Sequence, residues 1–172
     1  MLKVIGICLL AAGCGGIGFY ESMELTRHEE LLKQVRQMMI LLKGEIRYGN
    51  SSLCDVFEKL SERLGGELGK FLKEMAVQIQ GQKRACFSEI FSMSVKKTGI
   101  CRKMTAVENV LFLELGNFLG NSDRETQLRQ IEFYEKELEM CLEELCRQLP
   151  QKKKLYQNLG VLGGIFLAIL LW

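Results

Sequence analysis

Both ends of the sequence are apolar. From Val4 to Tyr20 no residue is charged, and these 17 residues would form a helix of about 25 Å at about 1.5 Å per residue. Residues 155–172 are also free of charge and lack the polar face that a helix on a globular surface keeps. We therefore predict that residues 1–20 and 155–172 are transmembrane helices in contact with the lipid bilayer.

The first apolar segment has a second interpretation. Lys3 precedes the segment, and Ala11-Ala12-Gly13-Cys14 approximates a lipoprotein cleavage box. The alternative function is thus an outward-facing, lipid-anchored envelope protein that is cleaved before Cys14. The segment stays apolar beyond Cys14 as far as Tyr20, which favours an anchor that is retained.

Small residues recur at four-residue spacing in both predicted spans. Gly160 and Gly164 form a GxxxG motif, and the pairs Ala11/Gly15 and Ala12/Gly16 have the same spacing. This pattern lets helix backbones approach closely in lipid. We expect the two spans to pack on each other through these residues.

The charges beside the spans predict the topology. Three lysines at 152–154 precede the second span, and Arg27, Lys33 and Arg36 follow the first, whereas Lys3 is the only basic residue before it. Basic residues beside a span tend to stay in the cytoplasm. The middle segment, residues 21–154, should therefore be a cytoplasmic domain.

The middle segment has helical periodicity. Its first stripe of apolar residues has three- and four-residue spacing and predicts an amphipathic helix that continues from the first span and stops near Gly49. The stripe consists of Leu25, Leu32, Val35, Met39, Leu42 and Ile46, with a second track at Leu31 and Met38.

Shorter helices follow, and their starts resemble capping boxes. The three starts are Ser52 with Asp55, Thr105 with Glu108, and Ser122 with Glu125. Breaks are expected at Gly65-Gly66, Gly81 and Gly99; the run Val110–Leu115 should lie at the centre of a bundle, and the last helix should run up to Pro150. No segment alternates as a strand would, so we predict an all-α helical bundle flanked by the two membrane helices.

Composition excludes several classes of function. The 172 residues suit one domain, and the net charge of +2 comes from 23 basic and 21 acidic residues mixed along the chain, so no nucleic acid partner is expected. Seven cysteines without a CxxC pair favour free thiols in a reducing compartment over a zinc site or a disulfide framework. Most of them adjoin apolar residues, as Cys86 does before Phe87, which is typical of a thiol in a core.

Residues for catalysis are also lacking. His28 is the only histidine, and the glycines form neither GxxxxGK[ST] nor a strand-flanked GxGxxG. Acidic residues of the last helix, including Glu132, Glu135 and Glu139, are expected to form a solvated face. We therefore predict no catalytic residue, no metal and no cofactor, and a function in binding or assembly.

Three segments, in this order, resemble the stage III sporulation protein AB family of endospore-forming bacteria. They are Arg36–Gly49, which leads to Ser52-Leu53; Leu115–Arg124; and Tyr156–Gly164. The resemblance covers essentially the whole chain. The sequence departs from the family pattern at Ser52, a place often taken by proline, and in its number of cysteines.

The resemblance implies a component of the channel-like complex between mother cell and forespore. It places the protein in the cell membrane on the mother-cell side of the forespore outer membrane, with the central domain cytoplasmic. It also implies a fold similar to the cytoplasmic domain of type II secretion and type IV pilus platform proteins. The implied partners are the secretion-type ATPase of the same complex and its other membrane components, so we expect a platform or adaptor.

The turns opposite the membrane are a candidate partner surface. If both long helices lead into the membrane, the turns Gly49–Ser52 and Gly120–Arg124 should lie together at the membrane-distal end. Asn121, Asp123 and Arg124 would then present polar and charged groups to a partner. Ser122 and Asp123 are equally explained as caps of the last helix, and the acidic face around Glu135 and Glu139 is the next candidate.

Overall fold

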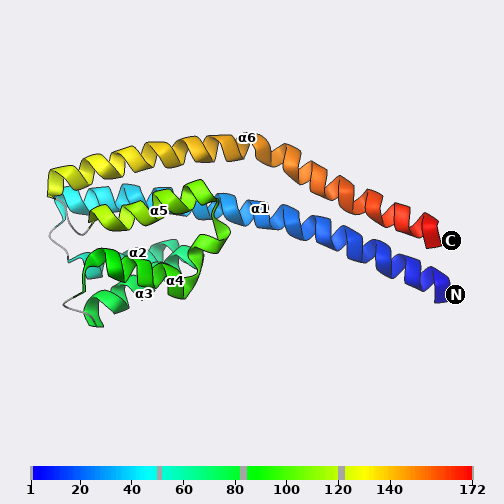
Figure 1. The fold of residues 1–172 in the computed structure, drawn as a ribbon, viewed down its shortest axis with the longest axis horizontal. Helices are drawn as coiled ribbons and strands as arrows, with labels where there is room; N and C mark the ends of the chain where they lie inside the picture. The colour runs from blue at the N-terminus through cyan, green and yellow to red at the C-terminus, as the bar shows by residue number, and fades with distance from the viewer. Residues whose placement is uncertain (1, 50–51, 82–84, 120–122, 172) are drawn as a thin grey trace. The chain divides into compact units, whose positions relative to one another are not determined.

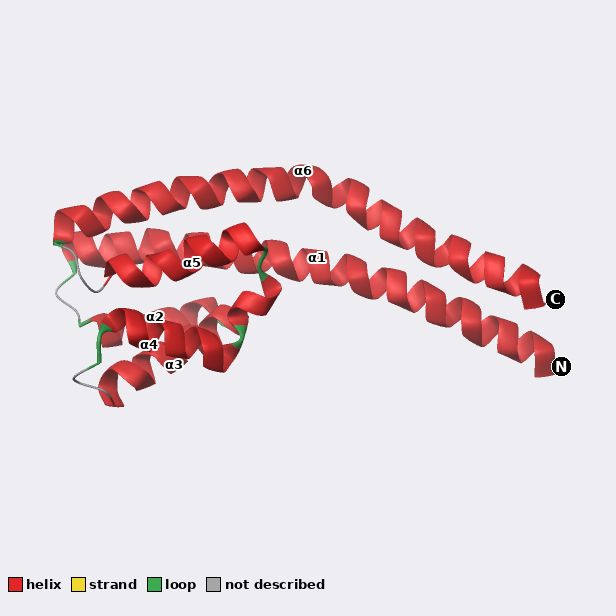
Figure 2. Cartoon of the chain, viewed as in Figure 1, coloured by secondary structure: helices red, strands yellow, loops and turns green. Residues whose placement is uncertain are grey.

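The structure, a computed structural model, describes residues 2–49, 52–81, 85–119 and 123–171. The described residues form helices joined by turns, with no strand among them, so the all-α prediction is confirmed (Figure 2). In chain order the elements are α1 (Leu2–Tyr48), α2 (Leu53–Leu64), α3 (Gly66–Gly81), α4 (Phe87–Thr98), the 3-10 helix η1 (Ile100–Lys103), α5 (Ala106–Leu119) and α6 (Arg124–Leu171).

The chain divides into two compact units. The first is made of the two ends of the chain, up to Glu29 and from Glu143 onward, and the second is Glu30–Leu142. α1 and α6 contribute to both units, and α2 to α5 belong to the second alone (Figure 1). Both unit boundaries fall inside residues 21–154, the segment that the sequence predicts as the cytoplasmic domain.

α1 carries the apolar stripe that its periodicity predicts. Within the second unit Ile46 of the stripe is partly exposed, and the other six side chains of the stripe face the core and are at most 4% exposed. They are Leu31, Leu32, Val35, Met38, Met39 and Leu42. The helix is also uninterrupted from the first predicted span into the second unit, as expected from the lack of proline.

Two of the three predicted capping boxes start helices as expected. The hydroxyl of Ser52 accepts a hydrogen bond from the Asp55 amide at 3.3 Å. The Thr105 amide donates to the Glu108 carboxylate at 2.8 Å, and the Glu108 amide donates to the Thr105 hydroxyl at 3.4 Å. Each bond pairs a backbone donor that has no partner within its own helix.

The core of the second unit is aromatic. Phe71 of α3, Phe91 of α4 and Phe112 of α5 have ring centroids 5.1–5.2 Å apart, and each side chain is at most 2% exposed. α5 approaches α4 at Gly116, where an added Cβ would lie 2.5 Å from the Phe91 ring. The absence of a side chain at Gly116 therefore determines how closely these two helices pack.

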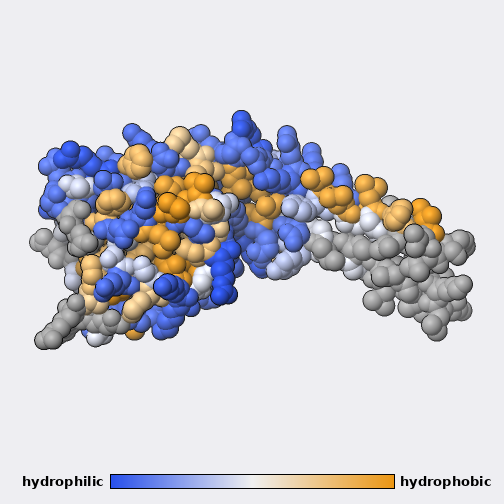
Figure 3. Space-filling model, in the orientation of Figure 1, coloured by the Kyte–Doolittle hydropathy of each residue, from blue (hydrophilic) through white to orange (hydrophobic). Residues whose placement is uncertain are grey.

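The prediction that Val110–Leu115 lies at the centre of the bundle is only half right. Phe112 and Leu115 are 2% and 1% exposed, but Val110 is 55% exposed and Leu113 is 39% exposed. α5 packs against the rest of the second unit through one face, so residues on its other face meet solvent. Figure 3 shows this apolar surface in orange over the position that α5 occupies in Figure 1.

The prediction that the last helix runs only up to Pro150 is wrong, because α6 continues through this proline to Leu171. Proline has no N–H, so it cannot donate to the carbonyl of Cys146 four residues earlier. Both residues are exposed, which lets water bind that carbonyl. The helix can thus continue past the proline.

Large apolar side chains are exposed along the C-terminal end of α6 (Figure 3). Leu159, Leu162 and Phe166 are 56%, 62% and 66% exposed. Among the described residues, no helix has a stretch both long enough and apolar enough to cross a membrane. The two transmembrane helices expected from the sequence therefore stay a prediction.

Candidate functional site

α1 and α6 are joined in the second unit by ion pairs. Arg36 lies 2.6 Å from Glu139, and Lys43 lies 3.0 Å from Glu132 and 3.7 Å from Glu135. The Lys43 ammonium beside Glu132 lowers the pKa of that carboxyl. The expected acidic face is thus still in contact with solvent at Glu132 and Glu139, whose side chains are 45% and 46% exposed, but each of the three glutamates also pairs with a cation of α1.

Arg124 connects the start of α6 to the end of α1. Its guanidinium donates from Nε to the carbonyl oxygen of Ile46 and from Nη2 to that of Arg47. Carbonyls in the last turn of a helix have no donor within the helix, so a cation there both bonds them and suits the negative end of the helix dipole. This contact places Arg124 beside the last turn of α1, whereas residues 50–51 and 120–122 of the two predicted turns lie outside the described residues, so the proximity of the turns stays a prediction.

Of the other residues of the predicted partner surface, only Asp123 is described. Asp123 caps α6, because its carboxylate accepts a hydrogen bond from the Thr126 amide at 3.1 Å, and this bond lowers the pKa of Asp123. Asn121 and Ser122 lie outside the described residues. The described cap of α6 is thus made by Asp123, and Arg124 is exposed beside it.

A recess of about 230 Å³ lies where α1, α2 and α6 meet, and we call it the turn recess. It is lined by Leu42, Glu45, Ile46, Gly49, Leu53, Val56, Arg124 and Gln127. Tyr48, which is 82% exposed, adjoins it in the sequence. Apolar walls beside a guanidinium could receive an apolar side chain with a carboxylate near it.

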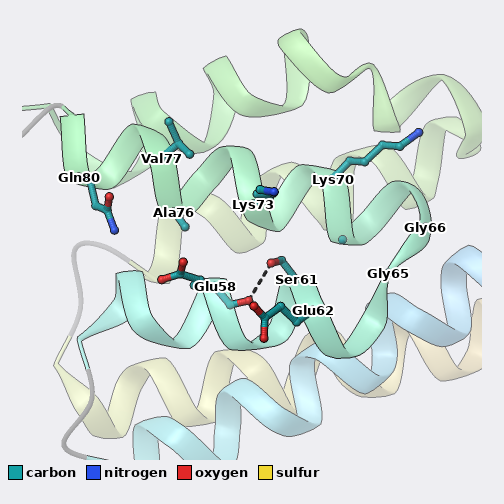
Figure 4. A pocket seen from close by; sticks show the side chains of 11 residues that line it. Glu58, Ser61, Glu62, Gly65, Gly66, Lys70, Lys73, Ala76, Val77 and Gln80 are labelled. Atoms are coloured by element: carbon teal, nitrogen blue, oxygen red, sulfur yellow. Dashed lines mark hydrogen bonds between the residues drawn. The ribbon is translucent and has the colours of Figure 1, made fainter.

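A second depression, the α2–α3 groove, has a volume of about 480 Å³. Its lining comprises Glu58, Ser61, Glu62, Gly65, Gly66, Gly69, Lys70, Lys73, Ala76, Val77 and Gln80. Acidic side chains come from α2 and basic side chains from α3 (Figure 4). Sequence reasoning missed this groove, since its charges look like ordinary solvated positions.

The backbone between the groove walls has an unusual conformation. Gly65 and Gly66 have φ angles of 61° and 58°, in the left-handed region that favours glycine. They reverse the chain between α2 and α3. At Gly69 an added Cβ would lie 2.8 Å from the Ser61 carbonyl oxygen, so this glycine allows the two helices to approach closely.

In the first unit, α1 and α6 make a close backbone contact at Gly18. A Cβ there would lie 2.5 Å from the Tyr156 carbonyl oxygen and 3.3 Å from the Gly160 Cα atom. Gly160 thus lies opposite Gly18, and Gly164 is buried. Gly18 itself was missed, although Gly18 and the buried Ser22 have the same small-xxx-small spacing.

The remaining residues predicted to pack the two helices together are either outside the Gly18 contact or not described. Gly16 is exposed, and a Cβ on it would meet nothing within 4 Å, so it lies outside this contact. The side chains of Ala11 and Ala12, and the surroundings of Gly15, lie outside the described part of the structure. Among the described residues of the first apolar segment, the close contact with α6 lies at Gly18, and a contact at Ala11, Ala12 and Gly15 stays a prediction.

The described thiols are free, as predicted, at Cys54, Cys86, Cys101, Cys141 and Cys146. Burial raises the pKa of Cys101 and Cys141, which keeps these thiols protonated. Cys86 is exposed and is the N-cap residue of α4, so its expected place in the core is wrong. In the described ranges no three His, Cys, Asp or Glu side chains gather as metal ligands would.

Comparisons with known proteins agree on one family, and the two sequence comparisons cover nearly the whole chain. A family model described as stage III sporulation protein AB matches residues 3–172. The chain is 23% identical over 172 residues to stage III sporulation protein AB of Bacillus subtilis (strain 168), and the alignment covers 99% of each chain. A solved structure of a stage III sporulation protein AB is similar with a TM-score of 0.62 at 19% identity, over 69% of this chain and 93% of that one, which shows a shared fold.

Proposed function

This chain belongs to the stage III sporulation protein AB family, and we propose on that premise that it is a membrane-anchored adaptor that docks a cytoplasmic secretion-type ATPase. Membership of the family assigns the protein to sporulation and confirms the resemblance found in the sequence. The complex it serves is the channel-like assembly between mother cell and forespore. The observation that carries the proposal is the family match, which includes both apolar ends as well as the helical middle.

The membrane anchor in this proposal consists of residues 1–20 and 155–172, with the protein on the mother-cell side of the forespore outer membrane. Two observations support it. Neither segment has a charged residue after Lys3, and α6 exposes large apolar side chains at Leu159, Leu162 and Phe166. Such side chains are costly in water and favourable in hydrocarbon. The second unit would then lie in the mother-cell cytoplasm.

We place the docking surface at the turn recess. Asp123 and Arg124 are exposed beside it, and Tyr48 and Leu53 add exposed apolar surface at 82% and 36%. Aromatic and apolar side chains beside an arginine are typical of residues that dominate the binding energy of protein interfaces. Asn121 belongs to the proposed surface by its position in the sequence. Arg124 positions this surface, because it holds the end of α1.

Co-purification tests the docking proposal directly. The full chain, solubilised in detergent, should retain a secretion-type ATPase encoded in the same genome. Leu53→Asp should abolish retention by placing a carboxylate in the recess, whereas Val107→Asp, at a residue 63% exposed on α5, should leave it unchanged. Equal retention by both variants would show that the turn recess is not the docking surface. If the unaltered chain retained no ATPase, the docking proposal itself would be rejected.

Topology and processing need separate tests. In intact cells a membrane-impermeant thiol reagent should not label Lys70→Cys in a cysteine-free background, and it should do so after permeabilisation. Labelling in intact cells would overturn the cytoplasmic placement.

Mass spectrometry of the mature N-terminus should find an intact Met1–Tyr20 segment, whereas an acylated Cys14 would establish the envelope-protein alternative.

A further inference from the structure

The two rims of the α2–α3 groove carry opposite charges. Glu58 and Glu62 stand four residues apart on α2, and hence on one face of that helix, and Lys70 and Lys73 come from α3 (Figure 4). Lys70 makes one contact of 3.7 Å, with Glu67 of its own helix. Within the described ranges no ion pair joins one rim to the other. The groove thus holds its opposite charges apart.

Elsewhere in the second unit, opposite charges on different helices do meet. Lys97 of α4 lies 2.7 Å from Glu74 of α3, and Arg36 lies 2.6 Å from Glu139 across α1 and α6. The rim charges of the groove are separated by its floor, which is made of small residues. These are Ser61, Gly65, Gly66, Gly69 and Ala76. A floor without large side chains leaves room for another protein surface to approach the backbone closely.

We propose that the α2–α3 groove is the docking surface for a second copy of this chain. A two-fold axis that lies in the interface, parallel to the length of the groove, would place the acidic rim of each copy against the basic rim of the other. Such an interface is isologous, since Glu58 and Glu62 of one copy meet Lys70 and Lys73 of the second copy and the reverse pairs form equally. The side chain of Val77, which is 56% exposed at the groove, would be buried in the same contact.

Charge complementarity favours a second copy of this chain as the partner of the groove. A partner of one sign would be attracted by one rim and repelled by the other. A fitting surface must carry both signs at the same separation and in opposite order, and the groove itself meets this requirement when rotated by half a turn. The inference goes beyond ATPase docking and does not rest on it, because the turn recess and the groove are lined by different residues.

Two differently tagged copies of the full chain, solubilised together, test the proposal. Unaltered copies should capture each other. Glu58→Lys/Glu62→Lys makes both rims basic and Lys70→Glu/Lys73→Glu makes both acidic, so each variant should lose self-capture by at least about tenfold through like-charge repulsion. Mixed with each other, the two variants should regain capture, since both rim contacts then join opposite charges.

The mixed pairing also shows that both variants are folded. As a charge-change control, Lys136→Glu on the exposed surface of α6 should leave self-capture unchanged. Without any substitution, capture of the unaltered chain should weaken as salt rises to about 1 M, because ions screen exposed charges. Absent capture of the unaltered chain, capture insensitive to salt, or mixed variants that fail to pair would each overturn the proposal.

Discussion

Arg124, the first residue of α6, holds the last turn of α1 by donating a hydrogen bond from its guanidinium Nε to the carbonyl oxygen of Ile46. A second bond, to the carbonyl of Arg47, uses Nη2 of the same group. Arg124, which the sequence suggested as a partner-binding residue, thus also stabilises the fold. Charge reversal at Arg124 would disturb the fold as well as any docking, so Leu53 is the better position for a binding test.

Arg124→Ala should lower the free energy of unfolding by about 1–2 kcal/mol, because it removes charge-assisted hydrogen bonds from carbonyls that have no other helix donor. Urea denaturation of the full chain in detergent, followed by circular dichroism, measures this. Arg129→Ala is the matched control, as Arg129 pairs with Glu125 on its own exposed helix face, and should cost at most about 0.5 kcal/mol. Equal losses in both variants would contradict the role assigned to Arg124.

Two glycines of the second unit should respond in opposite directions to the same substitution. Gly116→Ala places a Cβ 2.5 Å from the Phe91 ring and should destabilise the protein by about 1–3 kcal/mol through overpacking. Gly44→Ala, where a Cβ meets nothing within 4 Å, should stabilise it by about 0.5–1 kcal/mol through helix propensity. Thermal unfolding midpoints that shift in the same direction would reject the close approach of α4 and α5.

The ion pair between Glu74 and Lys97 should make stability depend on pH. The hydrogen bond from Lys97 lowers the pKa of Glu74 below its ordinary value of 4.5, so the folded state binds the proton less tightly than the unfolded state. The stabilisation is therefore complete above that value and is lost as the pH falls through the folded-state pKa. Lys97→Met should lower the melting temperature at pH about 7, and the difference from the parent should shrink near pH about 3. A difference that persists unchanged at low pH would contradict this.

In the first unit, Gly18→Ile should separate the ends of α1 and α6, because its side chain would enter the space of the Tyr156 carbonyl. Gly16→Ile is the control, since a Cβ at that glycine meets nothing within 4 Å. Disulfide cross-linking between a cysteine at Glu29, whose carboxylate lies 3.7 Å from the Cys146 sulfur, and the native Cys146, compared across both variants, reports the approach of the two helices. Unchanged cross-linking in Gly18→Ile would show that the contact does not depend on this glycine.

Helix boundaries could be predicted from the sequence because their signals are local. The caps at Ser52 and Thr105 and the turn at Gly65 depend on residues within four positions of each other. The apolar stripe of α1 could also be predicted, because the three- and four-residue spacing of apolar residues indicates which helix face is buried. The continuation of α6 through Pro150 was not, since it depends on whether the carbonyl four residues earlier is exposed.

The candidate sites were harder to predict, because their contacts join distant residues. Arg124 meets carbonyls 77 and 78 residues away, and Arg36 meets Glu139 at a separation of 103. No spacing within one helix indicates such pairs. The same holds for Gly18, whose contact with α6 is not visible in the pattern of α1 alone, and for the opposed rims of the α2–α3 groove.

The pairing of the first helix with the last also sets the order of folding during synthesis. The hairpins from α2 to α5 join neighbouring segments and can close as soon as they leave the ribosome, whereas loop closure between Arg36 and Glu139 has to wait for about a hundred further residues. Until then α1 can pack against the helices before α6, as Gln34 does on Leu64 of α2, but α6 cannot cover the stripe from Leu31 to Leu42, and part of it stays open to water. The nascent chain is thus most prone to aggregation just before α6 is translated.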